Sequence, residues 1–365
     1  ANVWYFKPLR IDWFYASVFA RFALDRPELL SSLRILPRWL DFYGADLDDV
    51  SPAAEDKAAG QVRAGLAMLR RYERSGLDRE GQLSFDTLEY FLRIQVEGER
   101  WRHHDFPVNQ TYGMQTALPN FMAQVHQVTD AGEARDYVAR LDKFPRKFGQ
   151  LIGSLKLREA KGVIPPQFTL EKGLGEMRGF AARPPQQTPL YSSFKEKLDQ
   201  VPAGRMDAAA RERLLAQVEE AILRSVQPAY QSLIAYMAAL QPKAQGNHGA
   251  WHLPDGEAYY AWCVRQHTTT DMSPQQLHEL GQAEVARIGG EMAAILEARG
   301  LRKGTIGARV QQLSRDPAQV FPNTAEGKQS MLARYRALLD EVDKGIGAAF
   351  TGSGGRFRNA RPSPM

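Results

Sequence analysis

The sequence lacks the features that mark several large classes of protein. Its 365 residues include a single cysteine, Cys263, so no disulfide can form within the chain. No stretch approaches the ~20 consecutive apolar residues of a membrane-spanning helix. No glycine-rich phosphate loop follows a strand-like segment, and the predicted helices vary too much in length for a solenoid repeat. We therefore expect neither a disulfide scaffold, nor a P-loop protein, nor a membrane span in this chain.

An excess of charge is also absent. The formal net charge is only +5, and basic and acidic residues alternate along segments such as 211–224. Alternating charges are typical of a solvated helical surface, whereas nucleic-acid binding requires clustered basic side chains. Nucleic acid is therefore not expected as a partner.

Amphipathic helical patterns fill most of the chain. Apolar residues recur at three- and four-residue steps, and a hydrophobic content of 44% suits a sizeable core. The pattern predicts a predominantly α protein with helices at 11–24, 53–75, 84–101, 133–141, 143–161, 167–179, 190–198, 207–240, 257–266, 274–299, 305–315 and 324–348. We predict one helical domain over 1–350 and a Gly/Arg/Pro-rich tail over 351–365; the proline-rich connector 181–189 is the best candidate for a subdomain seam.

Some helices carry further signals. The segment 11–24 is apolar on most sides, which predicts a helix buried on most of its faces. Pro228 predicts a kink in a long helix. Ser273 followed by proline, with Gln276 three residues on, predicts a helix start with a capping box, and Gly300 predicts the end of that helix. The apolar residues between them predict one face packed on a core.

The stretch from 249 to 300 is the most informative. A turn precedes a short aromatic helix with Tyr259 and Tyr260, and a polar turn at 267–270 then leads into the long helix. Cys263 within the aromatic helix is interpreted as a small buried hydrophobe. A nucleophilic role would need a positioned histidine, for which His267 is a weak candidate.

Two other segments raise alternatives. His103, His104 and Asp105 suggest a metal site, but adjacent histidines diverge on a helix and lack the four-residue spacing of paired ligands, so surface or capping positions are favoured. The segment 106–122 breaks the helical pattern. It is either an ordered connection or a cleft wall whose amides, including that of Gln115, hydrogen-bond a peptide backbone.

Three runs resemble one known family in the same order along the chain. They are WYFKPLRIDWFYASVFARFALDRPELL (4–30), PVNQTYGMQTALPNFM (107–122) and PDGEAYYAWCVRQHTTTDMSPQQLHELGQAEVARIGGEM (254–292). The chain resembles the bacterial domain-of-unknown-function 885 family over roughly Trp4 to Phe350. Members of that family are helical proteins similar to zinc peptidases. The resemblance thus implies a multi-helix array like the N-terminal part of thimet-oligopeptidase-like metallopeptidases.

The sequence departs from the family in one important respect. The family's zinc motif, His-Glu-x-x-His, lies in its C-terminal half, which this chain is expected not to reach. The one His-Glu pair, His278-Glu279, is followed by Leu-Gly-Gln and so lacks the second histidine. We therefore predict no catalytic residue, metal ligand or cofactor in this chain, and zinc only in a full-length family member. A truncated product and a natural short relative are the two explanations, and we favour truncation.

The resemblance implies the N-terminal portion of a zinc metallopeptidase-like hydrolase that acts on peptides and is inactive alone. The alternative is a non-catalytic helical binding protein, which leaves open whether the chain is an enzyme. Seven residues are predicted to line a peptide-binding cleft: Tyr112, Gln115, Tyr259, Tyr260, Arg265, His267 and Thr268. The family's usual leader or anchor implies a periplasmic or otherwise exported protein, with a cytoplasmic location as the alternative. Self-association through exposed apolar surface is a further prediction.

Overall fold

The computed structural model describes residues 7–244 and 249–349, and every regular element within them is a helix. This confirms the prediction of a predominantly α protein. Contacts between residues divide the chain into two units, Ala1–Asp271 and Met272–Met365, which are taken separately below. The connector 181–189 lies within the first unit, and the predicted tail 351–365 lies outside the described residues. None of the described helices combines the length and the hydropathy that a bilayer crossing requires.

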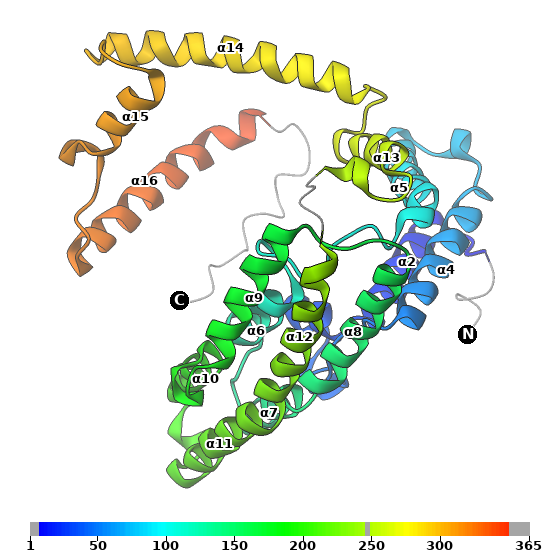
Figure 1. Ribbon diagram of the computed structural model, residues 1–365, viewed down its shortest axis with the longest axis vertical. Helices are drawn as coiled ribbons and strands as arrows, with labels where there is room; N and C mark the ends of the chain where they lie inside the picture. The colour runs from blue at the N-terminus through cyan, green and yellow to red at the C-terminus, as the bar shows by residue number, and fades with distance from the viewer. Residues whose placement is uncertain (1–6, 245–248, 350–365) are drawn as a thin grey trace. The chain divides into compact units, whose positions relative to one another are not determined.

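The helices of each unit are labelled in Figure 1. The first unit contains α2 (Ile11–Leu24), α3 (Pro27–Leu33), α4 (Pro52–Leu69), α5 (Arg79–Gly98), α6 (Met114–Asn120), α7 (Ala131–Leu141), α8 (Phe144–Ala160), α9 (Gln167–Ala181), α10 (Pro189–Gln200), α11 (Ala208–Ala221), α12 (Gln227–Leu240) and α13 (Gly256–Thr268). The second contains α14 (Pro274–Ala298), α15 (Ile306–Ser314) and α16 (Ala325–Ala349).

Local capping sets many of the helix starts. The Ser51 hydroxyl accepts a hydrogen bond from the backbone N–H of Ala54 (3.2 Å) at the start of α4. At α14 the predicted capping box is confirmed, because Ser273 accepts from the Gln276 N–H (3.2 Å) and Gln276 Oε1 accepts from the Ser273 N–H (2.9 Å). Such caps satisfy N–H groups that the helix itself cannot pair.

The main core lies among α6 to α12. The Tyr230 ring on α12 is fully buried and contacts Phe148 on α8 (centroids 5.0 Å apart) and Phe180 on α9 (4.6 Å). Tyr137 on α7 packs against Phe194 on α10 at 4.7 Å. Each such buried aromatic side chain contributes roughly 1.5–3 kcal/mol through removal of its surface from water. These helices therefore form a packed scaffold.

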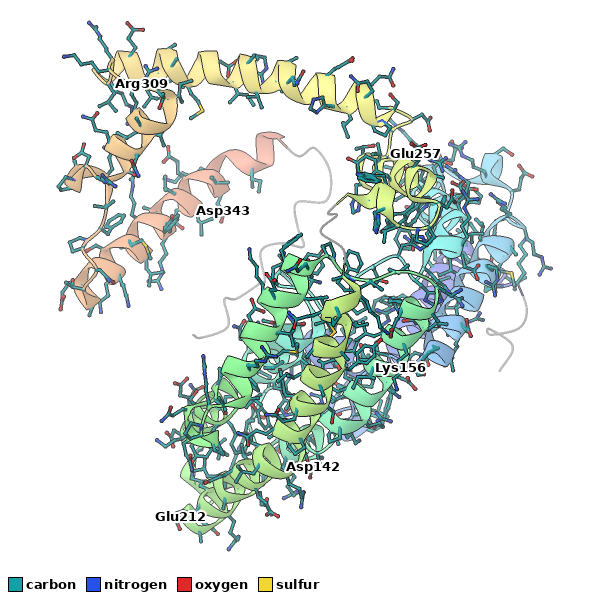
Figure 2. All side chains as sticks on the ribbon, in the orientation of Figure 1. Asp142, Lys156, Glu212, Glu257, Arg309 and Asp343 are labelled. Atoms are coloured by element: carbon teal, nitrogen blue, oxygen red, sulfur yellow. The ribbon has the colours of Figure 1, made fainter. Side chains whose placement is uncertain are left out.

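The break predicted near Pro228 coincides with a π-helical turn, Ile222–Val226, between α11 and α12. Because proline lacks an N–H and its ring crowds the preceding turn, a regular α-helix is disfavoured there. The Asp142 carboxylate, labelled in Figure 2, accepts hydrogen bonds from Arg224 and Ser225 in this turn, each at 2.8 Å. The π turn is thus held by a side chain at the α7–α8 junction.

A smaller core joins α2, α4 and α5. Its buried members are Phe14, Leu66, Leu69, Phe85 and Leu92. The prediction that α2 is buried on most of its faces is wrong, because Trp13 is 53% exposed and both Phe19 and Phe22 remain accessible. Only one stripe of α2 contacts its neighbours in the described structure, although most of its surface is apolar.

The second unit has almost no core of its own. Its three helices form as predicted, but the expected burial of the apolar face of α14 is wrong: Val285 is 74% and Ile295 60% exposed. Among its described residues, 272–349, Leu296 is the only large apolar side chain that is buried. Figure 2 shows side chains projecting from α14 and α16. In this unit, therefore, the helices form where the sequence predicts them, but the predicted burial of their apolar faces does not follow.

Candidate functional site

The aromatic helix predicted to line a cleft is α13. It begins after Asp255, whose backbone is left-handed (φ 53°), and ends before Thr269, which is also left-handed (φ 56°). Only glycine fits at position 256, the first residue of α13, because a Cβ atom added there would lie 2.2 Å from the Ala250 carbonyl oxygen. The turn before α13 thus packs directly against its first residue.

Tyr259 of α13 belongs to an aromatic cluster. Its ring lies 6.1 Å from that of Trp262, 6.3 Å from that of Trp101 and 4.9 Å from the His104 imidazole. Burial raises the pKa of the Tyr259 hydroxyl above its ordinary value, and the hydrogen bond with Cys263 raises it further. Tyr260, its neighbour in sequence, is 49% exposed. The structure therefore separates the two tyrosines, one packed and one facing solvent.

The remaining predicted residues of this stretch differ in their contacts. Arg265 pairs with Glu97 on α5 (3.0 Å), and its carbonyl accepts from the Tyr90 hydroxyl (2.8 Å). The Thr268 hydroxyl donates to the Val264 carbonyl (2.8 Å), while His267 is exposed. Burial raises the pKa of the Cys263 thiol, which reduces its thiolate fraction and so argues against a nucleophilic role.

The predicted residues of the 106–122 segment make hydrogen bonds within that segment. The Gln115 amide is buried and donates to the Asn109 carbonyl (2.6 Å), and the Gln115 carbonyl accepts from the Tyr230 hydroxyl. The Asn109 side chain accepts from the Tyr112 N–H (2.9 Å), and the Tyr112 ring is 80% exposed. None of the seven predicted residues is among those that line the large pocket of the first unit.

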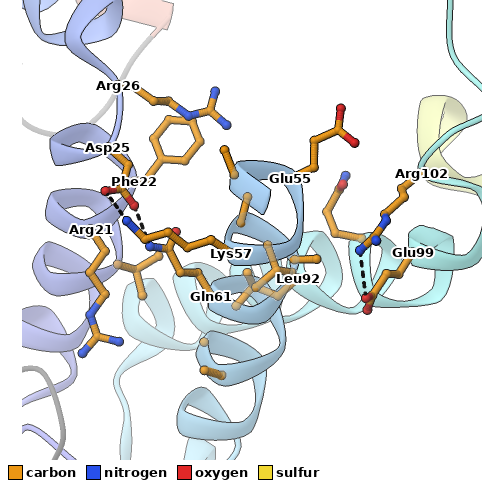
Figure 3. Close-up of a pocket in the computed structure, with 18 of the residues that line it drawn as sticks. Arg21, Phe22, Asp25, Arg26, Glu55, Lys57, Gln61, Leu92, Glu99 and Arg102 are labelled. Carbon is orange, nitrogen blue, oxygen red and sulfur yellow. Dashed lines mark hydrogen bonds and ion pairs between the residues drawn. The ribbon is translucent and has the colours of Figure 1, made fainter. Parts of the chain in front are cut away.

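That pocket lies around α4, between α2, α5 and the C-terminal part of α8, and its volume is about 1840 Å³ (Figure 3). Apolar side chains from three helices form much of its wall: Val18, Phe19, Phe22, Val62, Leu88 and Phe91. Trp262 of α13 also lines it, because Gly98 leaves room for the indole: a Cβ there would lie 2.0 Å from the ring. The Trp262 N–H donates to the Ile94 carbonyl (2.9 Å), which fixes the ring on α5.

One side of the pocket, next to α8, carries ion pairs of the buried Arg158. The Arg158 guanidinium donates twice to Asp105 Oδ1, from Nε (3.1 Å) and Nη2 (2.7 Å). Glu55 Oε1 accepts from the Ser154 hydroxyl (2.9 Å) and lies 3.5 Å from Arg158. Because Arg158 is only 4% exposed, these partners are needed to offset the cost of burying its charge.

His103 lies behind these ion pairs. Its Nε2 accepts from the Arg102 Nε–H (3.1 Å), so Nδ1 carries the hydrogen, and Nδ1 lies 3.4 Å from Glu55 Oε2. Burial lowers the pKa of His103, which favours the neutral imidazole. Both His103 and His104 are buried, so the surface position that their sequence suggested is wrong. Loop packing against α13 encloses them, since His104 Nε2 also contacts the Pro254 carbonyl (2.7 Å).

The other side of the pocket is next to α2. Asp25 accepts from Lys57 Nζ (2.6 Å) and from the Gln61 amide (2.8 Å), both on α4, as the dashed lines in Figure 3 show. These hydrogen bonds and the Lys57 charge lower the pKa of Asp25 although its partial burial alone would raise it. The Arg26 guanidinium stacks over the Phe22 ring at 4.0 Å. The pocket thus combines an apolar wall with ionic groups on two sides.

The described residues do not supply a metal site. No group of three or more His, Cys, Asp or Glu side chains in 7–244 and 249–349 is placed to hold a metal ion, so these residues do not fit the zinc that the family resemblance implies. What the pocket can do is bind a ligand through apolar contacts and ionic groups. The 106–122 segment, named from the sequence as an alternative cleft wall, contributes Pro107 and Met114 to the lining. Sequence reasoning missed the rest of the pocket because Glu55 and Arg158 are ordinary helical residues about a hundred positions apart.

Comparisons with known proteins agree with the helical architecture. The family described as "Bacterial protein of unknown function (DUF885)" matches residues 30–357. The crystal structure of the "putative lipoprotein" from Colwellia psychrerythraea is similar, with a TM-score of 0.77, 23% identity and coverage of 92% of this chain. A "putative lipoprotein of unknown function" from Shewanella oneidensis is similar with a TM-score of 0.57 and 14% identity, again over 92% of this chain.

This chain spans 60% of the length of the Colwellia protein and 58% of that of the Shewanella protein. At these identities the likeness shows the fold alone. No curated protein matches the chain.

Proposed function

Because the chain belongs to the DUF885 family of bacterial proteins, whose description assigns no function, we propose that its first unit binds peptides in the pocket between α2, α4, α5 and α8. One observation carries the proposal: the pocket has a volume of about 1840 Å³ and is lined by accessible aromatic side chains. Small-molecule sites commonly measure ~300–1,000 Å³, so the larger space favours an extended ligand. Apolar walls with ionic groups at two sides suit a peptide that has both side chains and charged ends.

Hydrolysis of the bound peptide is the activity that the family resemblance implies. We propose it, together with the likeness to thimet-oligopeptidase-like enzymes, only for family members that carry the His-Glu-x-x-His motif. For the residues described in this chain, a binding role is favoured, because they contain no group of three or more His, Cys, Asp or Glu side chains placed to hold a metal ion. Export is proposed from the descriptions of the two structural relatives as candidate lipoproteins.

The binding proposal is tested with fluorescently labelled apolar peptides and anisotropy. Phe91→Ala and Phe22→Ala each remove an accessible aromatic side chain from the pocket wall, and we expect affinity to fall roughly tenfold. Leu223→Ala is the matched control, because Leu223 is 51% exposed and does not line the pocket. Unchanged affinity in both pocket variants, or an equal loss in the control, would refute the assignment of the site.

Zinc analysis and a peptidase assay on the same protein separate binding from catalysis. Peptide binding without turnover is the expected result. Stoichiometric zinc together with turnover would instead support the hydrolase activity in this chain. Cell fractionation of the native bacterium tests the location. We expect the protein outside the cytoplasm, and its recovery in the cytosolic fraction would refute export.

A further inference from the structure

The last helix of the second unit, α16, carries an apolar stripe that remains exposed in the described structure. The apolar residues recur at three- and four-residue steps, so they fall on one side of the helix. Six of them are 39–65% exposed: Leu332, Tyr335, Leu338, Leu339, Val342 and Ile346. Continuous exposed apolar surface of this kind marks a site of interaction.

Charged residues border the stripe in a definite order. Arg336 and Asp340 are four residues apart and therefore lie along the same edge of it. Arg334 and Glu341 are two helical turns apart and lie along the other edge. On both edges the basic residue precedes Leu338 and the acidic residue follows it. The bordered stripe is thus basic in its first half and acidic in its second half.

These four charged side chains are not satisfied within the described part of the chain. On α14, by comparison, the Arg287 guanidinium pairs with two glutamates of its own helix (2.7 and 2.6 Å). None of the four charged side chains that border the α16 stripe forms an ion pair with any residue in 7–244 or 249–349. Both the apolar surface and the charges of α16 therefore remain available to a partner.

A second copy of α16, placed antiparallel to the first, matches both features. About a two-fold axis at Leu338, each residue before Leu338 faces a residue that lies equally far after it in the other copy. Arg336 of one copy then lies opposite Asp340 of the other, and Arg334 lies beside Glu341, while the apolar stripes meet between these charges. Charges that border an apolar seam set the orientation of paired helices. A parallel pair would bring the two basic halves together.

From this self-complementary arrangement we propose that α16 is the contact surface of a homodimer, in which two copies of this chain pair their α16 helices antiparallel about Leu338. The proposal is independent of peptide binding by the first unit. The stripe is only ~21 Å long, and a single helix pair of that length buries less than the ~1,200–2,000 Å² of a standard interface. We therefore expect a weak dimer, with a Kd on the order of 10 μM, and an exposed Tyr335 in dilute solution.

Sedimentation velocity of the full chain from about 1 to 100 μM tests the dimer. Monomer should predominate at the lowest concentration and dimer at the highest. Tyr335→Glu places a charge within the stripe and should raise the Kd at least tenfold, because that charge would lose its water in the dimer. Val285→Glu is the matched control, because Val285 is an apolar residue of α14 that is 74% exposed, and it should leave the Kd unchanged.

Charge reversal tests the antiparallel orientation. Arg336→Asp sets like charges opposite each other at two places in the dimer and should raise the Kd roughly tenfold. Adding Asp340→Arg to the same chain exchanges the two charges and should bring the Kd back to within about twofold of its original value. Lys344→Asp makes the same change in net charge on the side of α16 that faces away from the stripe, and it should have little effect. Circular dichroism checks the helix content of every variant.

A protein that stays monomeric at the highest concentration would overturn the proposal. Dimerisation that is unchanged by Tyr335→Glu, or that Val285→Glu weakens equally, would place the contact elsewhere and overturn it as well. A double variant that fails to recover the affinity lost in Arg336→Asp would refute the antiparallel pairing. Growth beyond a dimer with rising concentration would contradict a closed two-fold contact.

Discussion

The two units of this chain show helices formed under different conditions. In the first, residues such as Phe148 and Tyr230 are almost completely buried against neighbouring helices. In the second, α14 extends over 25 residues with a complete capping box, yet Leu296 is its only buried large apolar side chain. The difference teaches that local signals such as a capping box mark where a helix begins, whereas burial of its apolar face requires partners that the second unit does not provide among its described residues.

The largest contrast should appear when aromatic side chains are removed. Phe148→Ala is expected to lower the free energy of unfolding of the first unit by about 3–5 kcal/mol, because it leaves a cavity beside Tyr230. Tyr335→Ala on α16 should change stability by less than about 0.5 kcal/mol, because its side chain is 59% exposed. Urea unfolding followed by circular dichroism measures both. Similar losses would mean that Tyr335 is buried in solution, which would remove the contrast between the units.

Acid should also lower the stability of the first unit. Burial, together with the adjacent Arg140 guanidinium, which donates to His126 Nδ1 (2.6 Å), lowers the pKa of His126 to about 3. Because the folded-state pKa lies below the unfolded value of about 6.5, the unfolded chain binds the extra proton first. Stability should therefore be intact above pH 6.5 and fall as the pH drops from 6.5 towards 3.

The expected loss is on the order of 3 kcal/mol at pH 4. Stability measured from pH 7 to pH 4, together with an NMR titration of His126, checks this prediction. A His126 resonance that titrates near pH 6.5 in the folded protein would contradict it. The exposed His278 is the only histidine in the described part of the second unit, so that unit offers an internal control.

Substitution of two glycines by alanine is expected to change stability in opposite directions. Gly98→Ala should destabilise the first unit by about 1–3 kcal/mol, because the new methyl group would collide with the Trp262 ring. Gly281→Ala on α14 should stabilise its helix by about 0.5–1 kcal/mol, because nothing lies within 4 Å of the added atom. Thermal unfolding and tryptophan emission report the two effects. Destabilisation by Gly281→Ala would indicate a close packing partner for α14.

The smallest effect concerns the cap of α14. Ser273→Ala removes the acceptor for the Gln276 N–H and should weaken the first turn by about 1 kcal/mol. Hydrogen exchange should show faster amide exchange at the start of α14 and no change in α12, with Ser273→Thr, which keeps the hydroxyl, as the control. Equal protection in the serine and alanine proteins would show that contacts other than the cap hold this helix end.

Sequence reasoning succeeded where the determining interactions are local. The start of α14 follows from three neighbouring residues, and the family assignment follows from continuous runs. It failed for burial: α2 and α14 are apolar enough to suggest enclosure, but which faces find partners depends on distant helices. Most of the pocket was not found for the same reason, since Glu55 and Arg158 meet only through the packing of α4 on α8. The seven predicted residues were chosen from resemblance and residue type, and their role in binding stays a prediction.

The placement of Trp262 has a practical consequence. Its indole lines the pocket on one side and stacks with Tyr259 on the other, while its N–H is held by the Ile94 carbonyl. A molecule entering the pocket would displace water from one face of a ring that cannot turn away. If the proposed binding occurs, the emission of Trp262 is expected to change, and the change can be assigned by comparison with Trp262→Phe, without attaching any dye to the protein or to its ligand.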